Sequence, residues 1–502
     1  MKELHLPWLE LAIFSPLLGA ILVGRLRDPH RARIWCMVFT GISFLCSAGA
    51  WQDFQFLHAT QAEDHWHWMG SIFGRELFVI DQVSAPLLPM TALLYFLTAL
   101  ATLRTTVRKF SFAWTLLAES MVLAMYSCQE PWMVVGLLTA GTLPPYRELR
   151  ARGAPTRVYV THMGLFVVLM VAGWAIVSAE GVGNHHSLVG IMCLLMAVLI
   201  RSGIVPFHCW VPDLFENATF GSALLFVTPI VGAYGAVRLV LPIAPDWVLR
   251  SMGVISLITA VYAAGMALVQ KEGRRFFSYL FLSHSALVLV GLEMVTPIGL
   301  TGAFCIWLSV SLAMGGFGLT LRALEARRGR LSLMDFQGLY EHTPNLAMCF
   351  AITGLAAVGF PGTLGFVGAE LLVDGAVATY PFVGVAVVLA AALNGIAIVT
   401  AYLRLFTGVR YSSSVSLKIR VRERYAVLAL TALILIGGML PQDRVALCHH
   451  AAEELLRVRS SHAKSAVEHA VSTEPEAAEE SSAEVSARGK IAQEEHADHW
   501  LD

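Results

Sequence analysis

The chain has 502 residues, of which 56% are hydrophobic and only 14% are charged. An ordinary soluble domain has about 45–50% and about 25% of these classes, so the composition excludes a soluble multidomain enzyme, a basic nucleic-acid binder and a disulfide-rich secreted module. The net charge of -1 and the mean hydropathy of +0.65 average over two unlike parts, because residues 1–447 are apolar and residues 448–502 are not. The long apolar part indicates an integral membrane protein.

Apolar runs of transmembrane length recur along residues 1–447. A bilayer core about 30 Å thick takes roughly 20 apolar residues per helix. The sequence therefore predicts an all-α membrane domain of about fourteen transmembrane helices. These spans are 8–24, 34–50, 82–103, 112–127, 131–146, 158–178, 187–205, 219–241, 249–269, 276–295, 299–321, 346–373, 381–406 and 425–441.

Basic residues gather in alternate loops between these spans. The basic loops are 25–33, 104–109, 147–157, 271–275, 322–330 and 410–424. The opposite loops hold almost nothing basic beyond Arg75 and Arg250. Because cytoplasmic loops are enriched in Lys and Arg, we expect an inner-membrane protein with both termini in the periplasm.

The predicted tail, residues 448–502, has a different composition from the membrane domain. It carries twelve acidic and five basic residues and few large apolar ones. Such a segment cannot bury enough apolar surface to offset its chain entropy, so a disordered periplasmic tail is expected. A docking segment for a partner is the alternative, and residues 450–459 could form a short amphipathic helix.

The cysteines are scattered through the apolar runs. They are Cys36, Cys46, Cys128, Cys193, Cys209, Cys305, Cys349 and Cys448. None forms a Cys-x-x-Cys pair or has a histidine at ligand spacing. We interpret them as small hydrophobic residues and expect neither a metal site nor a bound cofactor.

Several ionisable residues fall inside or beside the predicted spans. They are Glu119, Arg201, His208, Arg238, His284, Glu370 and Arg404. An ionisable group inside a bilayer costs several kcal/mol unless it is paired or hydrated, so each is a candidate functional residue. Simpler roles exist: Arg238 and Arg404 could extend to the interface, His284 could be a hydrogen-bonded core residue, and Glu119 could pair with a neighbouring helix.

Helix-breaking residues interrupt three of these regions. Pro206 and Pro212 bracket one break, Pro229 marks a second, and Pro361 and Gly362 mark a third. Irregular backbone at membrane depth is tolerated only where protein or water satisfies it, and broken helices are typical of ion pathways. About five helices separate the first break from the third, as expected if spans four to eight and nine to thirteen are two five-helix repeats.

The residues around the first break carry a family resemblance. Residues 201–213, RSGIVPFHCWVPD, resemble the signature Lys-x-x-x-x-Pro-Phe-His-x-Trp-Leu-Pro-Asp of antiporter-like membrane subunits of respiratory complex I and of Mrp-type antiporters. The matching positions are Pro206, Phe207, His208, Trp210, Pro212 and Asp213. Segments 79–84, 274–284, 335–339 and 360–366 are also similar. The resemblance covers about residues 75–410, is nearest to the chain 4 type of complex I, and implies two inverted five-helix repeats.

The resemblance also implies a proton path, from which this sequence departs. In that family the path is attributed to a glutamate in span five, a lysine in span seven, a basic residue in span eight and a charge in span twelve. Those positions hold Thr139, Arg201, Ile230 and Ala369, with Glu370 one residue late. A guanidinium stays protonated in ordinary proteins, so Arg201 can set a field or bind an anion but is a poor proton relay.

Other titratable residues remain as proton-path candidates. His284 and His208 match histidines of the family, and Glu119 is a further carboxylate at membrane depth. Together with Arg201 and Glu370 they form the predicted proton path.

The resemblance predicts a membrane subunit, among other membrane subunits, that couples quinone-linked electron transport in partner chains to proton translocation. It would have no redox site of its own, because the sequence has no nucleotide or flavin motif and no cysteine cluster. Two alternatives keep the fold. One is the membrane partner of a DAB-type inorganic-carbon uptake complex, beside a carbonic-anhydrase-like soluble chain. The other is a scaffold that no longer conducts.

Overall fold

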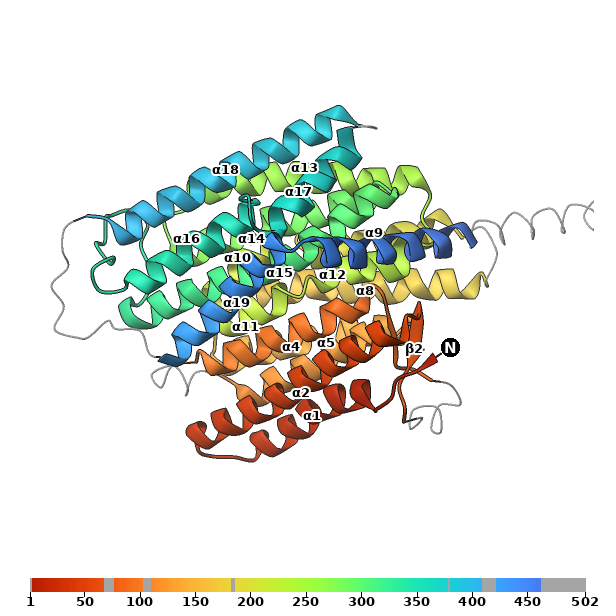
Figure 1. Cartoon of the computed structure of the whole chain (residues 1–502), viewed down its shortest axis with the longest axis horizontal. Helices are drawn as coiled ribbons and strands as arrows, with labels where there is room; N and C mark the ends of the chain where they lie inside the picture. Colours follow the sequence, from red (N-terminus) through yellow and green to blue (C-terminus); the bar gives the residue numbers. More distant parts are fainter. Residues whose placement is uncertain are drawn as a thin grey trace, which may run out of the picture.

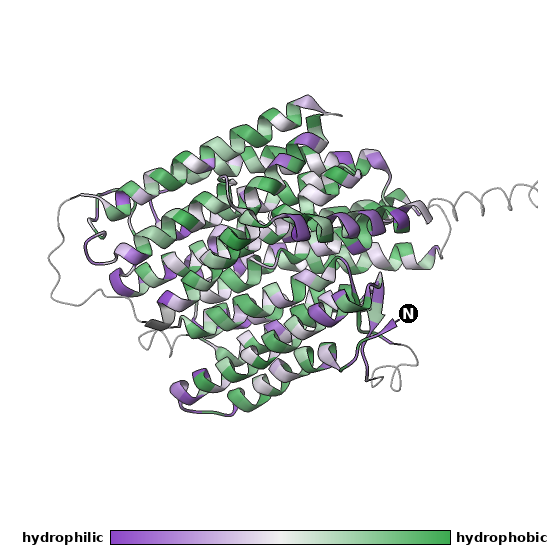
Figure 2. Ribbon diagram, in the orientation of Figure 1, coloured by the Kyte–Doolittle hydropathy of each residue, from purple (hydrophilic) through white to green (hydrophobic). Residues whose placement is uncertain are grey.

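The computed structural model describes residues 2–66, 76–102, 110–181, 186–377, 380–408 and 421–461. Its helices lie side by side in one bundle, roughly along the long dimension of the molecule (Figure 1). Apolar residues cover the length of this bundle and hydrophilic residues gather toward its two ends (Figure 2). The described residues contain seven helices long and apolar enough to cross a membrane, or eight if one bent pair is a single span. The helical membrane fold is confirmed, whereas the number fourteen is not.

Most predicted spans correspond to one helix each. These helices are α1 (Trp8–Gly24), α2 (Pro29–Leu57), α4 (Ser84–Leu100), α5 (Phe112–Tyr126), α8 (Arg157–Ala179), α9 (Leu188–Ser202), α13 (Asp246–Leu268), α14 (Gly273–Glu293), α15 (Pro297–Arg328), α18 (Pro381–Phe406) and α19 (Val421–Met439).

Spans five, eight and twelve are divided. Their pieces are α6 (Pro131–Ala140) with α7 (Leu143–Ala151), α11 (Phe220–Val227) with α12 (Val231–Gly235) and the π-helix η2 (Ala236–Val240), and α16 (Pro344–Val358) with α17 (Leu364–Val377). The short helix α10 (Trp210–Asn217) follows α9.

A small β-sheet near the N-terminus corrects the prediction of an exclusively helical fold. Strand β2 (Gln61–Glu63) pairs in parallel with β1 (Lys2–Glu3) and antiparallel with β3 (Val79–Asp81). These strands have only two or three residues, too few for an alternating pattern to be recognised in a sequence.

Glycines begin the breaks after α9 and α16. Gly203 (φ 70°) and Gly359 (φ 83°) each cap a helix in the left-handed conformation, which glycine adopts without steric cost. Pro206 and Pro361 follow within three residues and have no N–H to continue a helix. In Figure 1, α9 to α10 runs opposite to α16 to α17, as expected for inverted repeats.

The break between α11 and α12 has its backbone carbonyls satisfied by side chains. Pro229 O accepts hydrogen bonds from Tyr126 Oη at 2.5 Å and from Trp307 Nε1 at 3.2 Å. Thr228 O accepts one from Ser311 Oγ at 2.8 Å. Ile230 then takes φ 50°, an unfavourable value for a β-branched residue. Donors from α5 and α15 therefore hold an irregular backbone inside the bundle.

The chain continues beyond α19 in the helix Gln442–Ser461, which is bent by 81° from α19. Its buried stripe consists of Cys448, Ala451, Ala452 and Leu455, and Arg459 Nη2 pairs with Asp246 at 2.7 Å. The predicted boundary after residue 447 falls inside this helix. The expectation of disorder is therefore wrong for 448–461, because apolar residues at helical spacing find a surface to cover; residues 462–502 lie outside the described part.

The ends of the bundle can be compared with the predicted orientation. The α1–α2 connection, the end of α18 and the start of α19 lie at the left end in Figure 1. The N-terminus and the end of the helix Gln442–Ser461 lie at the right end, which agrees with an even number of crossings. Arg75, Arg104, Arg108, Lys109, Arg410, Lys418 and Arg420 lie outside the described residues.

Asp64 joins the sheet to α1. Its Oδ2 accepts a hydrogen bond of 2.7 Å from the backbone N–H of Glu10, in the first turn of that helix, where a negative charge is favoured. Burial raises the pKa of the Asp64 carboxyl from 3.8 to about 6, although hydrogen bonds from backbone N–H groups oppose the rise. Ionising the Asp64 carboxyl therefore costs more free energy in the folded state than in the unfolded chain.

We predict that Tyr126→Phe lowers the free energy of unfolding by about 1–2 kcal/mol, because Pro229 O loses one of its two donors deep in the bundle. Denaturant titration in detergent micelles measures the change. Tyr425→Phe is the control, since Tyr425 is 60% exposed. Equal stability of both variants and the natural chain would contradict the assignment.

We predict that Asp64 makes the fold less stable as the pH rises from 4 to 7. A carboxyl whose folded pKa is raised is most stabilising below its unfolded pKa, and that contribution disappears as the pH rises through 6. From pH 4 to pH 7, the free energy of unfolding of Asp64→Asn should rise by up to about 3 kcal/mol relative to that of the natural chain. Unfolding titrations at both pH values test this, with exposed Asp335→Asn as control. A pH-independent difference would refute it.

Candidate functional site

Three small cavities lie around the helix breaks. We name them the Arg201 cavity, the Ile230 cavity and the His284 cavity, with volumes of about 50, 10 and 30 Å³. A cavity of about 10–15 Å³ already accommodates one water molecule. The first and third can therefore be hydrated without moving any helix.

The Arg201 cavity is lined by α4, α5, α6, α7, α9, α11 and α12. Its polar lining consists of Tyr95, Trp114, Thr115, Glu148, Arg201 and Ser222. Glu148 was not among the sequence candidates, because it lies in the basic segment 147–157 that the charge pattern assigns to a loop. The break at Gly141 and Thr142 starts a new helix there, α7, which brings Glu148 to the cavity.

Arg201 is a buried cation without an opposite charge beside it. Its side chain is nine-tenths buried, Nη2 donates to Phe226 O at 3.2 Å, and the guanidinium lies 3.9 Å from the centre of the Phe226 ring. In the described part of the chain, Nε has no hydrogen-bond partner and no carboxylate forms an ion pair with Arg201. A cation–π contact offsets only about 2 kcal/mol of the desolvation cost, so water in the cavity would stabilise this charge.

The Ile230 cavity continues from Arg201 toward α14. Arg201 lines both cavities, and Ser202, Ile230 and Ser285 lie around the second one. A Cβ at Gly232 would come within 2.3 Å of Ser202 Oγ, so a larger residue there would push this hydroxyl aside. Ile230, at the position where the resemblance implies a basic residue, gives this cavity an apolar wall.

The His284 cavity also borders α14, where His284 and Leu287 line it. Nδ1 of His284 hydrogen-bonds to Leu280 O at 2.7 Å, so it carries a proton, and in a neutral ring Nε2 presents a lone pair. Asn394 Nδ2 donates to Ser283 Oγ at 2.8 Å. His284 Nε2 and Asn394 Oδ1 have no partner within the described residues, and both residues line the cavity. The backbone of Ala357 lies near the imidazole, so His284 faces a second polar group as well as the cavity.

Residue 369 and its neighbour are placed differently by α17. Ala369 lines the His284 cavity, whereas Glu370 is exposed on the outer face of the helix. The structure therefore does not bring Glu370 to the cavity, because one residue turns a helical side chain by about 100°.

The two remaining candidates also lie apart from these cavities. Glu119 is fully buried on α5, and neither carboxylate oxygen has a hydrogen-bond partner in the described ranges. His208 is half-buried beside the first break, with Nε2 3.4 Å from Tyr262 Oη. Arg201 and His284 are thus the sequence candidates that the cavities bring into one row.

Arg238 and Arg404 lie outside the three cavities and bind other parts of the chain. Arg238 Nη2 pairs with Asp81 Oδ2 at 2.6 Å, and Asp81 Oδ1 also accepts from Ser84 N at the start of α4. Arg238 is therefore ion-paired, which corrects its interpretation as an interfacial side chain. Arg404 Nη1 donates to Met334 O at 3.0 Å.

The signature residues hold the first break and the end of α10. Trp210 Nε1 donates to Ile200 O at 2.9 Å across the break, and Asn217 Nδ2 donates to Asp213 Oδ1 at 3.1 Å. Pro212 is buried in α10, Phe207 packs on the core, and Pro361 and Gly362 are exposed at the third break. Their role in the structure is to shape the breaks.

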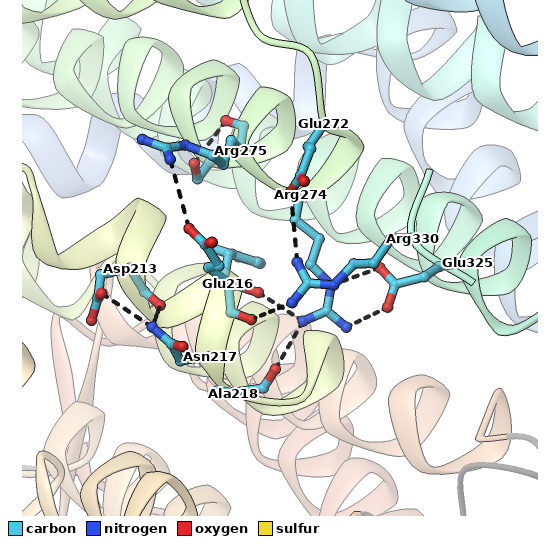
Figure 3. A network of polar contacts seen from close by, with 11 residues as sticks. Asp213, Glu216, Asn217, Ala218, Glu272, Arg274, Arg275, Glu325 and Arg330 are labelled. Atoms are coloured by element: carbon cyan, nitrogen blue, oxygen red, sulfur yellow. Dashed lines mark hydrogen bonds and ion pairs between the residues drawn. The ribbon is translucent and has the colours of Figure 1, made fainter. Parts of the chain in front are cut away.

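Arg274 connects α10 to the second repeat (Figure 3). Its Nη1 donates to Phe215 O at 2.8 Å and to Ala218 O at 3.0 Å, which are carbonyls at the end of α10. Its Nε donates to Glu325 Oε2 of α15 at 2.7 Å, and Nη2 also contacts this carboxylate. This arginine from α14 therefore joins the halves of the predicted repeat pair.

Comparison with known proteins agrees with this architecture. Residues 160–394 match the family described as NADH:quinone oxidoreductase/Mrp antiporter, TM. NADH-quinone oxidoreductase subunit M of Rickettsia prowazekii is 24% identical over 494 residues, which covers 90% of this chain and 99% of the relative.

Two solved structures have a similar fold. A chain of respiratory complex I from Thermus thermophilus gives a TM-score of 0.79 at 23% identity, over 90% of this chain and 99% of that one. A chain of the Mrp complex from Dietzia sp. DQ12-45-1b gives 0.79 at 18% identity, over 91% and 99%. The resemblance to antiporter-like membrane subunits of complex I and Mrp is confirmed; the solved structures at these identities show the fold alone.

We predict that Arg274→Lys lowers the free energy of unfolding by about 2 kcal/mol or more, because an ammonium cannot bind Glu325 through two donors and also cap α10. Arg275→Lys is the matched control. Arg275 is about half exposed, and its ion pair with Glu216 is long, at 3.7 Å. Its replacement should therefore change the free energy of unfolding by about 0.5 kcal/mol or less. Equal losses in both variants would show that Arg274 has no special role.

Proposed function

We propose that the chain is an antiporter-like membrane subunit that conducts protons within a larger membrane assembly. The observation that carries this proposal is the row of cavities through Arg201 and His284 at the helix breaks. Buried polar atoms without partners line this row, and buried polar groups otherwise find partners in proteins. Water along the row would satisfy them and would provide the hydrogen-bonded chain that a proton needs.

Arg201 and His284 have different roles in this proposal. Arg201 holds a fixed positive charge that repels a proton passing beside it and sets the energy of each protonated group nearby. His284 can accept a proton at Nε2 and release it, because a neutral imidazole that donates through Nδ1 has a lone pair on Nε2. Ser285, the residue after His284 on α14, lines the Ile230 cavity, and its hydroxyl, which donates to Leu282 O at 3.2 Å, can accept a hydrogen bond from water there.

The proposed driving force lies in partner chains. The names of the relatives and fold neighbours, NADH-quinone oxidoreductase subunit M and respiratory complex I, support an assembly in which other chains carry electrons to a quinone. We place the chain in the inner membrane, with the arginine-rich loops in the cytoplasm and both termini in the periplasm. The fourteen-span count and a tail at 462–502 belong to the same proposal.

A second candidate function is the membrane part of an inorganic-carbon uptake complex. Arg201 favours it, since a permanent and unpaired cation beside a cavity suits a small anion better than a proton. A neighbouring gene for a large soluble zinc protein would support this candidate, and neighbouring genes for quinone-reducing subunits would support the first. A third hypothesis is a scaffold subunit that does not conduct protons. The flux measurement below distinguishes this hypothesis from proton conduction.

We predict that His284→Ala lowers proton flux about 100-fold in vesicles containing the purified assembly, because the row loses its proton-exchanging imidazole. A pH-sensitive dye inside the vesicles measures flux. His162→Ala is the matched control: His162 also hydrogen-bonds through Nδ1 to a carbonyl four residues earlier, at 2.8 Å, but lies outside the three cavities.

Flux in His284→Ala equal to that in His162→Ala would contradict the role of His284. Absence of flux in the natural assembly would favour the scaffold.

A further inference from the structure

Glu148 is a buried acid that the proposed function has not yet used. Its side chain is nine-tenths buried on α7 and is the one carboxylate among the described residues that line the Arg201 cavity. Oε1 accepts a hydrogen bond of 2.7 Å from the backbone N–H of Thr219. This contact fixes the carboxylate at the wall of the cavity but leaves its second oxygen unused by that bond.

Glu148 lies toward the arginine-rich end of the bundle. Thr219 begins α11 directly after the end of α10, which Arg274 holds through Phe215 O and Ala218 O. The last turn of α7 contains Arg150. Arg201, in contrast, precedes the break between α9 and α10. The Arg201 cavity therefore extends from the arginine-rich end toward the first break.

Three charged or titratable side chains face the Arg201 cavity, and their chemistry differs. Charged and titratable groups facing the cavity are Tyr95 from α4, Glu148 from α7 and Arg201 from α9; the lining residues of α5, α6, α11 and α12 include none. A phenol ordinarily titrates near pH 10 and a guanidinium above pH 12. Only the carboxylate is suited to take up and release a proton during turnover.

Thr139 does not perform this task. It occupies the position at which the resembled family has its glutamate, but it is absent from the described lining of the cavity. Its hydroxyl donates to Gly136 O at 2.9 Å. Because the chain turns at Gly141 and Thr142, an acid nine residues later reaches the cavity that an acid on α6 would otherwise serve.

We infer that Glu148 is the proton-exchanging carboxylate of the Arg201 cavity and the entry point of the path from the arginine-rich end. The inference rests on the proposed proton conduction. In each cycle the carboxylate takes one proton from water at that end and becomes a neutral acid. It then releases this proton to water in the cavity and regains its charge, and no electrons are transferred.

The test compares Glu148→Gln with Glu216→Gln in the reconstituted assembly. Glutamine keeps an oxygen for the Thr219 N–H, so the fold is retained, but it cannot carry the proton. Glu216 lies at the same end, is about half exposed and lies outside the Arg201 cavity. We expect proton flux to fall about 100-fold in Glu148→Gln and to stay unchanged in Glu216→Gln. Glu148→Asp should retain part of the flux.

Infrared difference spectroscopy supplies a readout that does not depend on flux. The carbonyl band of a protonated carboxylic acid should appear on acidification of the natural assembly and of Glu216→Gln, and should be weaker in Glu148→Gln. Natural flux and an unchanged band in Glu148→Gln would overturn the inference while the proposed function stands. Absence of flux in the natural assembly would overturn the proposed function, and the infrared band would then decide whether Glu148 exchanges protons.

Discussion

A backbone carbonyl or amide at membrane depth has to find its partner inside the protein, and the architecture of this chain depends on that constraint. The breaks after α9, α11 and α16 release backbone groups that a continuous helix would satisfy. Tyr126, Trp307 and Ser311 donate to the carbonyls of one break, and Trp210 bridges another. Tyr126, Trp307 and Ser311 belong to α5 and α15, so the break after α11 binds these two helices together.

The cavities follow from these breaks. Arg201 lies two residues before Gly203, and Ile230 lies inside its break. Ala357 and Ala369 line the His284 cavity on either side of the break at Gly359. The fixed charge of Arg201 is therefore placed beside a break, whereas His284 and Asn394 lie within the continuous helices α14 and α18 and face the cavity beside the third break. Since few charges are available, the field of Arg201 would dominate the middle of the row, where the effective dielectric constant is low.

The sequence predicts this fold in most respects because its signals are local. Long apolar runs, alternating basic loops and proline pairs mark helices, orientation and breaks, each within about 20 residues. The sheet was missed because two-residue and three-residue strands leave no period. The helix Gln442–Ser461 was expected only in part, within 450–459, because its apolar stripe lies in a charged context. The site is harder, since a cavity brings together residues from many helices. The charge pattern assigned Glu148 to a basic loop, although it lines the Arg201 cavity. Glu370 was predicted to face the proton path, but its neighbour Ala369 lines the His284 cavity instead.

Proton conduction along the row needs water that passes Arg201 and reaches His284. A high-resolution structure of the assembled complex in a lipid environment would test it most directly, by locating ordered water. We expect water from Glu148 past Arg201 to Ser285, and again between His284 Nε2 and Asn394 Oδ1, with no carboxylate paired to the guanidinium. An Arg201 ion-paired with a carboxylate, together with cavities filled by apolar side chains, would contradict it.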